Sequence, residues 1–366
     1  MMNGSNIFLH MFDGMEDPRV NRTRIHPLES ILGLGLLGAL AGIDSFVGLQ
    51  DFAETHEDIL KTIVPFPGGI PSHDTIGRVF SLIEVERFHS IFFDFTEKLK
   101  RKVDELVAID GKTIRNSHGK NPLHVVSAWS ESNKLVLGQI KTDSKSNEIT
   151  AIPLLLDMLD LENNIISIDA MGCQKKIAQQ IVAKKGDYLL ALKGNQKNLY
   201  DDVRAYFENG EDLDEMSYWE EFDKGHGRIE KRQCWATSNI SWIKKHHDWA
   251  GLVTIAAVRC ERTIKHKKSS YTRFYISSLP DDAEKICNAA RMHWGIENKL
   301  HWCLDVVFNE DKCCIRNDNA PEIMGIMRKW ALNIHNTTKP KTVSLKRSLA
   351  KCAMSPKNAF AILRTL

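Results

Sequence analysis

Three acidic residues are the part of this sequence whose types and positions point most directly to chemistry. Asp110 ends the apolar run Leu-Val-Ala-Ile-Asp, and Asp169 ends a second one, Asn-Ile-Ile-Ser-Ile-Asp. Glu297 lies at the centre of Arg291–Asp305, a stretch rich in Trp and His. Both apolar runs are typical of buried strands, and functional groups gather at the carboxyl ends of strands in α/β sheets. We therefore expect the three carboxylates to meet in one cleft.

Converging carboxylates repel one another, and a cation stabilises them. Hard divalent metal ions with oxygen ligands satisfy such an arrangement. Two ions about 3.5–4 Å apart can activate a water or hydroxyl on one side of a phosphodiester and stabilise the leaving oxygen on the other. The acids therefore suggest metal-dependent phosphoryl transfer.

The stretch around Glu297 is predicted to form one helix over residues 281–304. Residues three and four apart share a helix face, so His293, Glu297 and His301 form a polar stripe. Apolar side chains form a different stripe, which is expected to face a core. Two His and one carboxylate also form a transition-metal ligand set, which is one alternative. That spacing covers about two helical turns, more than one ion comfortably spans.

Other acids compete with Glu297 for the third position. Asp305, Glu310 and Asp311 follow it closely, and Asp305 lies in an apolar run typical of a buried partner. Glu297 is the preferred third acid.

The elements that must position these residues change type along the chain. Residues 1–103 are predicted to be an all-α N-terminal domain that binds DNA or dimerises. Residues 104–338 follow the order β-β-β-α-β-α-β, which predicts a mixed α/β sheet with helices on both faces. Within this domain a mostly β insertion is expected at about 195–280. Residues 339–366 carry seven Lys or Arg and no acid, and are expected to form a basic tail.

Composition sets outer limits on the function. The chain has 366 residues and a formal net charge of +2. The overall charge therefore does not indicate a nucleic-acid partner, and any nucleic-acid site must depend on local patches of basic residues. The most apolar run, Ile31–Ile43, is shorter than the ~20 residues of a membrane helix and predicts a buried core helix. None of the eight cysteines has a zinc-ligand spacing, which favours reduced thiols in a cytoplasmic protein.

Several motifs, in order, resemble the H-repeat-associated group of bacterial insertion-sequence transposases. The quoted matches are Ile70-Pro-Ser-His-Asp-Thr-Ile-Gly-Arg78, Val107-Ala-Ile-Asp-Gly-Lys-Thr-Ile-Arg115, Ser167-Ile-Asp-Ala-Met-Gly-Cys-Gln174, His226-Gly-Arg-Ile-Glu230, His293-Trp-Gly-Ile-Glu-Asn-Lys-Leu-His-Trp302, Asp305-Val-Val-Phe-Asn-Glu-Asp311 and Arg328-Lys-Trp-Ala-Leu-Asn333. They cover nearly the whole chain.

The resemblance implies a DDE-type catalytic domain of ribonuclease-H-like fold, with Asp110, Asp169 and Glu297 as the triad. It implies Mg²⁺ (or Mn²⁺) as the cofactor. Two ions are expected, and Asp110 is expected to bridge them. It also implies element-end and target DNA as substrates, a homodimer assembled on DNA, no membrane partner, and a nucleoid-associated location in the cytoplasm.

One motif departs from the wider class of DDE transposases with a β insertion. Sequences of that class resemble one another in a Tyr-x2-Arg-x3-Glu-x6-Lys pattern around the third acid. When the Glu of this pattern is aligned with Glu297, its Tyr, Arg and Lys positions hold Ala290, His293 and Leu304. Its phosphate contacts are therefore not carried over. The candidate DNA contacts are instead nearby basic residues: Lys112, Arg228, Arg232, Arg291, His293 and Lys299.

These residues allow three functions. The preferred prediction is a transposase that cuts DNA at element ends and transfers the freed 3′-hydroxyl to target DNA. The second is a catalytically silent or domesticated DNA-binding protein, and the third is a nuclease without strand transfer.

Overall fold

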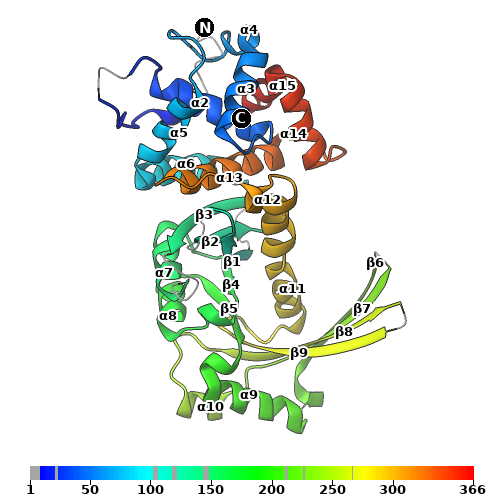
Figure 1. Cartoon of the computed structure of the whole chain (residues 1–366). Coiled ribbons are helices and arrows are strands. Elements are labelled where there is room, and N and C mark those ends of the chain that lie inside the picture. The colour runs from blue at the N-terminus through cyan, green and yellow to red at the C-terminus, as the bar shows by residue number, and fades with distance from the viewer. Residues whose placement is uncertain are drawn as a thin grey trace.

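The computed structural model describes residues 9–20, 24–101, 106–117, 122–142, 148–210, 213–225, 227–265 and 267–366. The molecule is elongated, with a helical body at one end, a large sheet in the middle and two helices at the far end (Figure 1).

Within the described residues the middle is one mixed sheet of nine strands, in the order β3-β2-β1-β4-β5-β9-β8-β7-β6. The first three strands form an antiparallel meander, and β4 and β5 run parallel to β1. The bounds are β1 (Leu106–Ile114), β2 (Leu123–Ser130), β3 (Leu135–Thr142), β4 (Ile165–Ile168), β5 (Asp187–Leu192), β6 (Ser217–Gly225), β7 (Arg228–Thr237), β8 (Thr254–Ile264) and β9 (Lys267–Ser277). The predicted mixed sheet is thus confirmed.

The register of β1 corrects the expected position of Asp110. This residue was expected to end its strand, but β1 continues to Ile114 because Asp110 and the residues after it pair with β2. The parallel pairing with β4, in contrast, ends at Ile109 opposite Ile168. Asp110 and Asp169 therefore each follow the last paired residue of neighbouring parallel strands, which sets them side by side.

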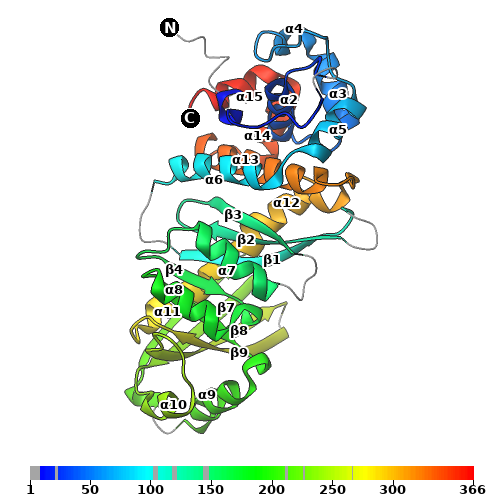
Figure 2. The same cartoon turned by 90° about the vertical axis from the view of Figure 1, so that its left-hand side faces the viewer.

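Helices cover both faces of the strands that carry these acids. α7 (Glu148–Met158) and α8 (Lys175–Ala183) lie on one side, and α11 (Ala283–His293) lies on the other (Figure 2). Side chains alternate along β1, so Val107 and Ile109 pack into one core while Leu106 and Ala108 pack into the other.

The expected insertion between β5 and α11 contains β6–β9 and continues the central sheet, since β9 pairs antiparallel with β5. It also contains α9 (Lys197–Asn209) and α10 (Ser241–His246), which the sequence analysis missed, as it missed β6. α9 buries only Leu199, Val203 and Phe207, one apolar residue per turn among many charges. So sparse an apolar stripe explains why its helical period was overlooked.

The predicted helix over 281–304 is interrupted. α11 ends at His293, a π-helical segment runs over Ile296–His301, and α12 covers Trp302–Val306. Between them lies Gly295, where a Cβ would collide with the Glu131 carboxylate. The segment therefore passes close to the β2–β3 turn at Gly295, where the backbone remains helical.

The helical body combines both ends of the chain. Its elements are η1 (Leu9–Phe12), α2 (Leu28–Leu40), α3 (Phe46–Thr55), α4 (Glu57–Leu60), α5 (His73–Leu82), α6 (Val85–Leu99), α13 (Ala320–Thr338), α14 (Leu345–Met354) and α15 (Pro356–Leu363). α2 is buried along nearly its whole length, as predicted for a core helix. α14 and α15 pack on α2, so the segment expected as a basic tail is folded here.

α13 and α6 join the helical body to the sheet, because both contact β3 and each other, and α13 also contacts α2. None of the helices in the described ranges combines the length and the hydropathy that a bilayer-spanning helix needs.

Candidate active site

The three predicted acids line one small pocket of about 120 Å³. Asp110 comes from β1, Asp169 follows β4, and Glu297 comes from the π-helical segment. Asp169 is held by accepting a hydrogen bond from the Met171 backbone N–H, 2.9 Å away, at the start of a short 3₁₀ turn. We call this cavity, with the carboxylates of Asp110, Asp169 and Glu297, the acid pocket.

The charges of the acid pocket are not balanced locally. Burial, then the carboxylates of Glu297 and Asp169, raise the pKa of Asp110 to about 8. Contact with the His301 imidazole is the main influence that lowers the pKa of Glu297. At neutral pH the Asp110 carboxyl thus resists ionisation unless a cation joins the site.

The two histidines of the polar stripe take different positions. The His293 ring lies 2.9 Å from the Ser167 hydroxyl, and its enclosure lowers its pKa to about 4. His301 instead faces the acids, with Nδ1 3.7 Å from Asp110 and 3.8 Å from Glu297. The alternative in which both histidines and Glu297 bind one ion does not match this arrangement, because the rings point to different partners.

These residues fit a divalent cation. One donor atom from each of Asp110, Glu297 and His301 lies within 4.8 Å of the other two. Carboxylate oxygens are the donors that Mg²⁺ and Mn²⁺ prefer, and burial together with the neighbouring carboxylates raises the pKa of Asp110, which a nearby cation would oppose. A cation held here could polarise a phosphate and activate a water.

The rival acids form a separate group around Lys112. Its Nζ lies 2.6 Å from both Asp305 and Glu310 and 3.7 Å from Asp311. We call these four residues the lysine cluster. The Lys112 side chain is only 7% exposed and Glu310 is fully buried. Asp305, Glu310 and Asp311 therefore balance a lysine instead of joining the acid pocket, and we do not carry forward the phosphate contact expected of Lys112.

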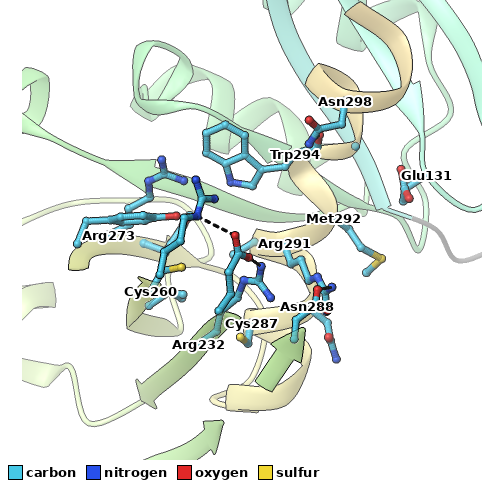
Figure 3. Close-up of a pocket in the computed structure, with 18 of the residues that line it drawn as sticks. Glu131, Arg232, Cys260, Arg273, Cys287, Asn288, Arg291, Met292, Trp294 and Asn298 are labelled. Atoms are coloured by element: carbon cyan, nitrogen blue, oxygen red, sulfur yellow. Dashed lines mark hydrogen bonds and ion pairs between the residues drawn. The ribbon is translucent and has the colours of Figure 1, made fainter. Parts of the chain in front are cut away.

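A wider cleft of about 840 Å³ lies beside the acid pocket, between α11 and the strands β7–β9. Figure 3 shows Arg232, Arg273 and Arg291 around this space, with Trp294 at its edge. The charged side chains that line it are Glu131, Asp223, Arg228, Glu230, Arg232, Arg262, Arg273, Arg291 and Lys299. Cations outnumber acids, so this surface favours a negatively charged partner.

Four of the predicted DNA contacts line this cleft, and each has an acidic partner. Arg228 lies 3.1 Å from Glu230, and Arg232 lies 3.0 Å from Glu221. Arg291 bridges Glu221 and Asp223, and Lys299 pairs with Glu131. His293, in contrast, lines the acid pocket and is neutral at pH 7, so it does not supply the positive charge expected at that position. His226 lies outside the described residues.

Two cations at the acid pocket escaped the sequence analysis. Arg273 on β9 lines both cavities, and its guanidinium stacks 4.5 Å above the Trp294 ring. Lys193, just after β5, lies at the rim of the acid pocket and is exposed. The available signal was the alternation of Tyr271, Arg273 and Tyr275 on one face of a predicted strand.

Comparison with known families now adds to the geometry. Residues 101–334, well over half of the chain, match the family described as Transposase DDE domain. The chain belongs to this DDE transposase family. Residues 9–96 match the model described as DDE_Tnp_1-associated, so family similarity covers the helical N-terminal part of this DDE-family chain as well.

Similar proteins extend the likeness over nearly the whole chain. The H repeat-associated putative transposase YhhI of Escherichia coli (strain K12) is 42% identical over 355 residues, which cover 92% of each chain. Putative protein YbfL of the same organism has the same identity and coverage. The resemblance to H-repeat-associated transposases is therefore confirmed.

A solved structure of the piggyBac transposase synaptic complex with hairpin DNA has a TM-score of 0.45 and 11% sequence identity, and the match covers 99% of this chain and 81% of that one. At that TM-score the likeness supports no conclusion about this DDE-family chain.

Proposed function

We propose that this chain is an active DDE transposase, which cuts DNA at the ends of an insertion element and joins the freed 3′-hydroxyl to target DNA. The acid pocket is the observation that carries the proposal: three carboxylates from distant parts of the chain line one pocket, with Asp110 held at a pKa of about 8. Family membership supplies the substrate class.

Asp110, Asp169 and Glu297 are the residues that would hold Mg²⁺ or Mn²⁺. A divalent cation bound there supplies positive charge that lowers the pKa of a water and stabilises a phosphate in its reacting form. The carboxylates fix the place of that charge, since each is anchored on an element of the central sheet or on the π-helical segment.

Basic residues around the pocket would position the DNA. Arg273 and Lys193 lie where a phosphate entering the acid pocket would pass, so they take the role first expected of His293 and Lys112. Arg228, Arg232, Arg291 and Lys299 would exchange their acidic partners for backbone phosphates in the cleft. Such contacts set position and affinity without reading sequence.

The wider organisation follows from the same proposal. We infer that residues 104–338 form a ribonuclease-H-like catalytic domain, that 1–103 form a DNA-binding or dimerisation domain, and that 339–366 add basic charge beside it. The working form is a homodimer assembled on element ends, associated with the nucleoid in the cytoplasm.

A nicking assay tests the proposal. Full-length protein is incubated with supercoiled plasmid that carries the element ends, with Mg²⁺, with Mn²⁺ or with chelator. We expect metal-dependent cleavage by the parent and none by Asp110→Asn, with Asp201→Asn, at an exposed aspartate on α9 away from both cavities, as the matched control. DNA binding with no nicking under any metal condition would overturn the enzyme and leave the silent DNA-binding protein.

A second plasmid added as target separates the transposase from the stand-alone nuclease. Joined products that require a free 3′-hydroxyl support strand transfer. Cleaved ends that never join the target would contradict it.

A further inference from the structure

We propose that His301 is a direct nitrogen ligand of the cation held between Asp110 and Glu297, so that this chain binds Mn²⁺ in preference to Mg²⁺. The inference rests on the proposed metal centre and adds to its three acids a ligand that is not an oxygen.

Distances around the imidazole carry the first part of the argument. His301 Nδ1 lies 3.7 Å from Asp110 Oδ2 and 3.8 Å from Glu297 Oε2. Both separations are too long for good hydrogen bonds. They match two donors that share one ion, since bonds of roughly 2.0–2.2 Å to a common cation place their donor atoms about 3–4.3 Å apart.

Burial carries the second part. The His301 side chain is 9% exposed, and its Nε2 is buried with no hydrogen-bond partner in the described part of the chain. A ring held in place by packing, with its other nitrogen toward two carboxylates, is a pre-positioned ligand.

Local backbone structure explains how His301 reaches the acids. It is the last residue of the π-helical segment, and Glu297 is the second. A π-helical turn is wider than an α-helical turn and re-aims the side chains that follow it, which is why such segments are frequent at functional sites. His293, about two turns before His301, stays outside this arrangement and lies against Ser167.

The ligand type predicts the metal preference. Imidazole nitrogen binds first-row transition metals better than it binds Mg²⁺ or Ca²⁺, while carboxylates bind all of them. A site with two carboxylates and one imidazole therefore gains affinity for Mn²⁺ relative to Mg²⁺, whereas a site of carboxylates alone does not.

Pulsed electron paramagnetic resonance of Mn²⁺ bound to the full-length protein tests this directly. A coordinated imidazole gives a ¹⁴N coupling in the electron spin echo signal. We expect the coupling in the parent and in His293→Gln, and its loss in His301→Gln. We also expect His301→Gln to weaken Mn²⁺ binding by at least about tenfold, with a smaller effect on Mg²⁺ measured by competition.

Histidine labelled with ¹⁵N provides a test without any substitution. The label must change the coupling pattern of the parent, so the inference stays falsifiable even if His301→Gln fails to fold.

Three outcomes overturn the inference, at different levels. If Mn²⁺ binds to the parent, is lost in Asp110→Asn, and shows no nitrogen coupling, His301 is not a ligand and the metal centre of the proposed function stands. If Mn²⁺ binds equally to the parent and to Asp110→Asn, the metal centre itself is wrong. A coupling lost in His293→Gln and kept in His301→Gln would assign the nitrogen to the wrong histidine and contradict the proposal.

Discussion

The acid pocket and the lysine cluster both include a residue of β1, but they shift the pKa values of their buried carboxyl groups in opposite directions. Asp110 and Lys112 are two residues apart on β1, so they share a face of the strand. Each meets acids from the segment that follows α11. In the acid pocket burial and repulsion raise the pKa of Asp110 to about 8. In the lysine cluster burial alone would raise the pKa of Glu310, but Lys112, Lys329 and Arg328 lower it to about 2.

The difference shows where each group finds its positive charge. The lysine cluster has its own cation, and its closest pair, Lys112 and Glu310, is buried, so it has the character of a structural link between β1 and the segment that follows α12. The acid pocket has more negative charge than its surroundings balance, and Glu297 is 53% exposed. A pocket that is both unbalanced and open is suited to a cation from solution.

The largest expected effect separates the two groups by activity. Asp169→Asn should reduce metal-dependent nicking by at least ~10³-fold, equivalent to about 4 kcal/mol of barrier, because it removes a ligand. Asp305→Asn, in the lysine cluster, should keep nicking within about tenfold, since Glu310 still pairs with Lys112. Initial rates under saturating Mg²⁺ measure both. If Asp305→Asn were as inactive as Asp169→Asn while remaining as stable as the parent, the functional distinction between the acid pocket and the lysine cluster would be wrong.

Stability should show the reverse order. Glu310→Gln leaves Lys112 and Lys329 buried without their main counter-charge, and breaking a buried pair in this way costs about 3–5 kcal/mol. Glu297→Gln should cost the metal-free protein much less, because Glu297 is half exposed and loses mainly its contact with His301. Urea unfolding in chelator measures the free energies. Equal losses for both variants would contradict the comparison.

The pH dependence of the metal-free protein sharpens the electrostatic argument. An aspartate whose folded pKa is about 8 binds a proton that the unfolded chain, with a pKa near 3.8, has lost. Stability must therefore fall as pH rises between these values, by up to about 1.4 kcal/mol per pH unit from this group. Asp110→Asn should flatten that part of the profile from pH 5 to 8, and saturating Mn²⁺ should flatten it in the parent. A profile that Asp110→Asn leaves unchanged would show that Asp110 is not the group that titrates.

The smallest effect concerns the cleft. Arg291→Ala should weaken binding to element-end DNA and reduce the slope of log affinity against log salt by about 1, if its guanidinium contacts a phosphate. Arg204→Ala is the matched control, because Arg204 is exposed on α9 and paired with Glu208 outside the cleft. Equal salt slopes for the two variants would remove Arg291 from the DNA surface.

Much of the fold was predictable because strands and helices leave periodic patterns. The meander, β4 and β5 were found from apolar runs, and the mixed sheet followed from their order. The charged helix α9 was missed because its buried stripe is only one residue wide. The π-helical segment was missed because its buried apolar residues, Ile296 and Leu300, have the spacing of an ordinary helix.

The candidate site was predictable to a similar degree. Residue types and positions singled out Asp110, Asp169 and Glu297, which line one pocket. They did not reveal that Lys112 is held by acids from residues 305–311, or that Arg273 reaches the pocket from β9. Both facts are pairings across the fold, and no local pattern encodes them.

Equilibrium binding of Mn²⁺ to the metal-free protein tests the central claim most directly, which is that the acid pocket takes its positive charge from a metal ion. Titration followed by electron paramagnetic resonance should show Mn²⁺ binding in the parent that excess Mg²⁺ displaces. The same binding should persist in Asp305→Asn and be lost in Asp110→Asn. Equal Mn²⁺ affinity in the parent and in Asp110→Asn would contradict the account.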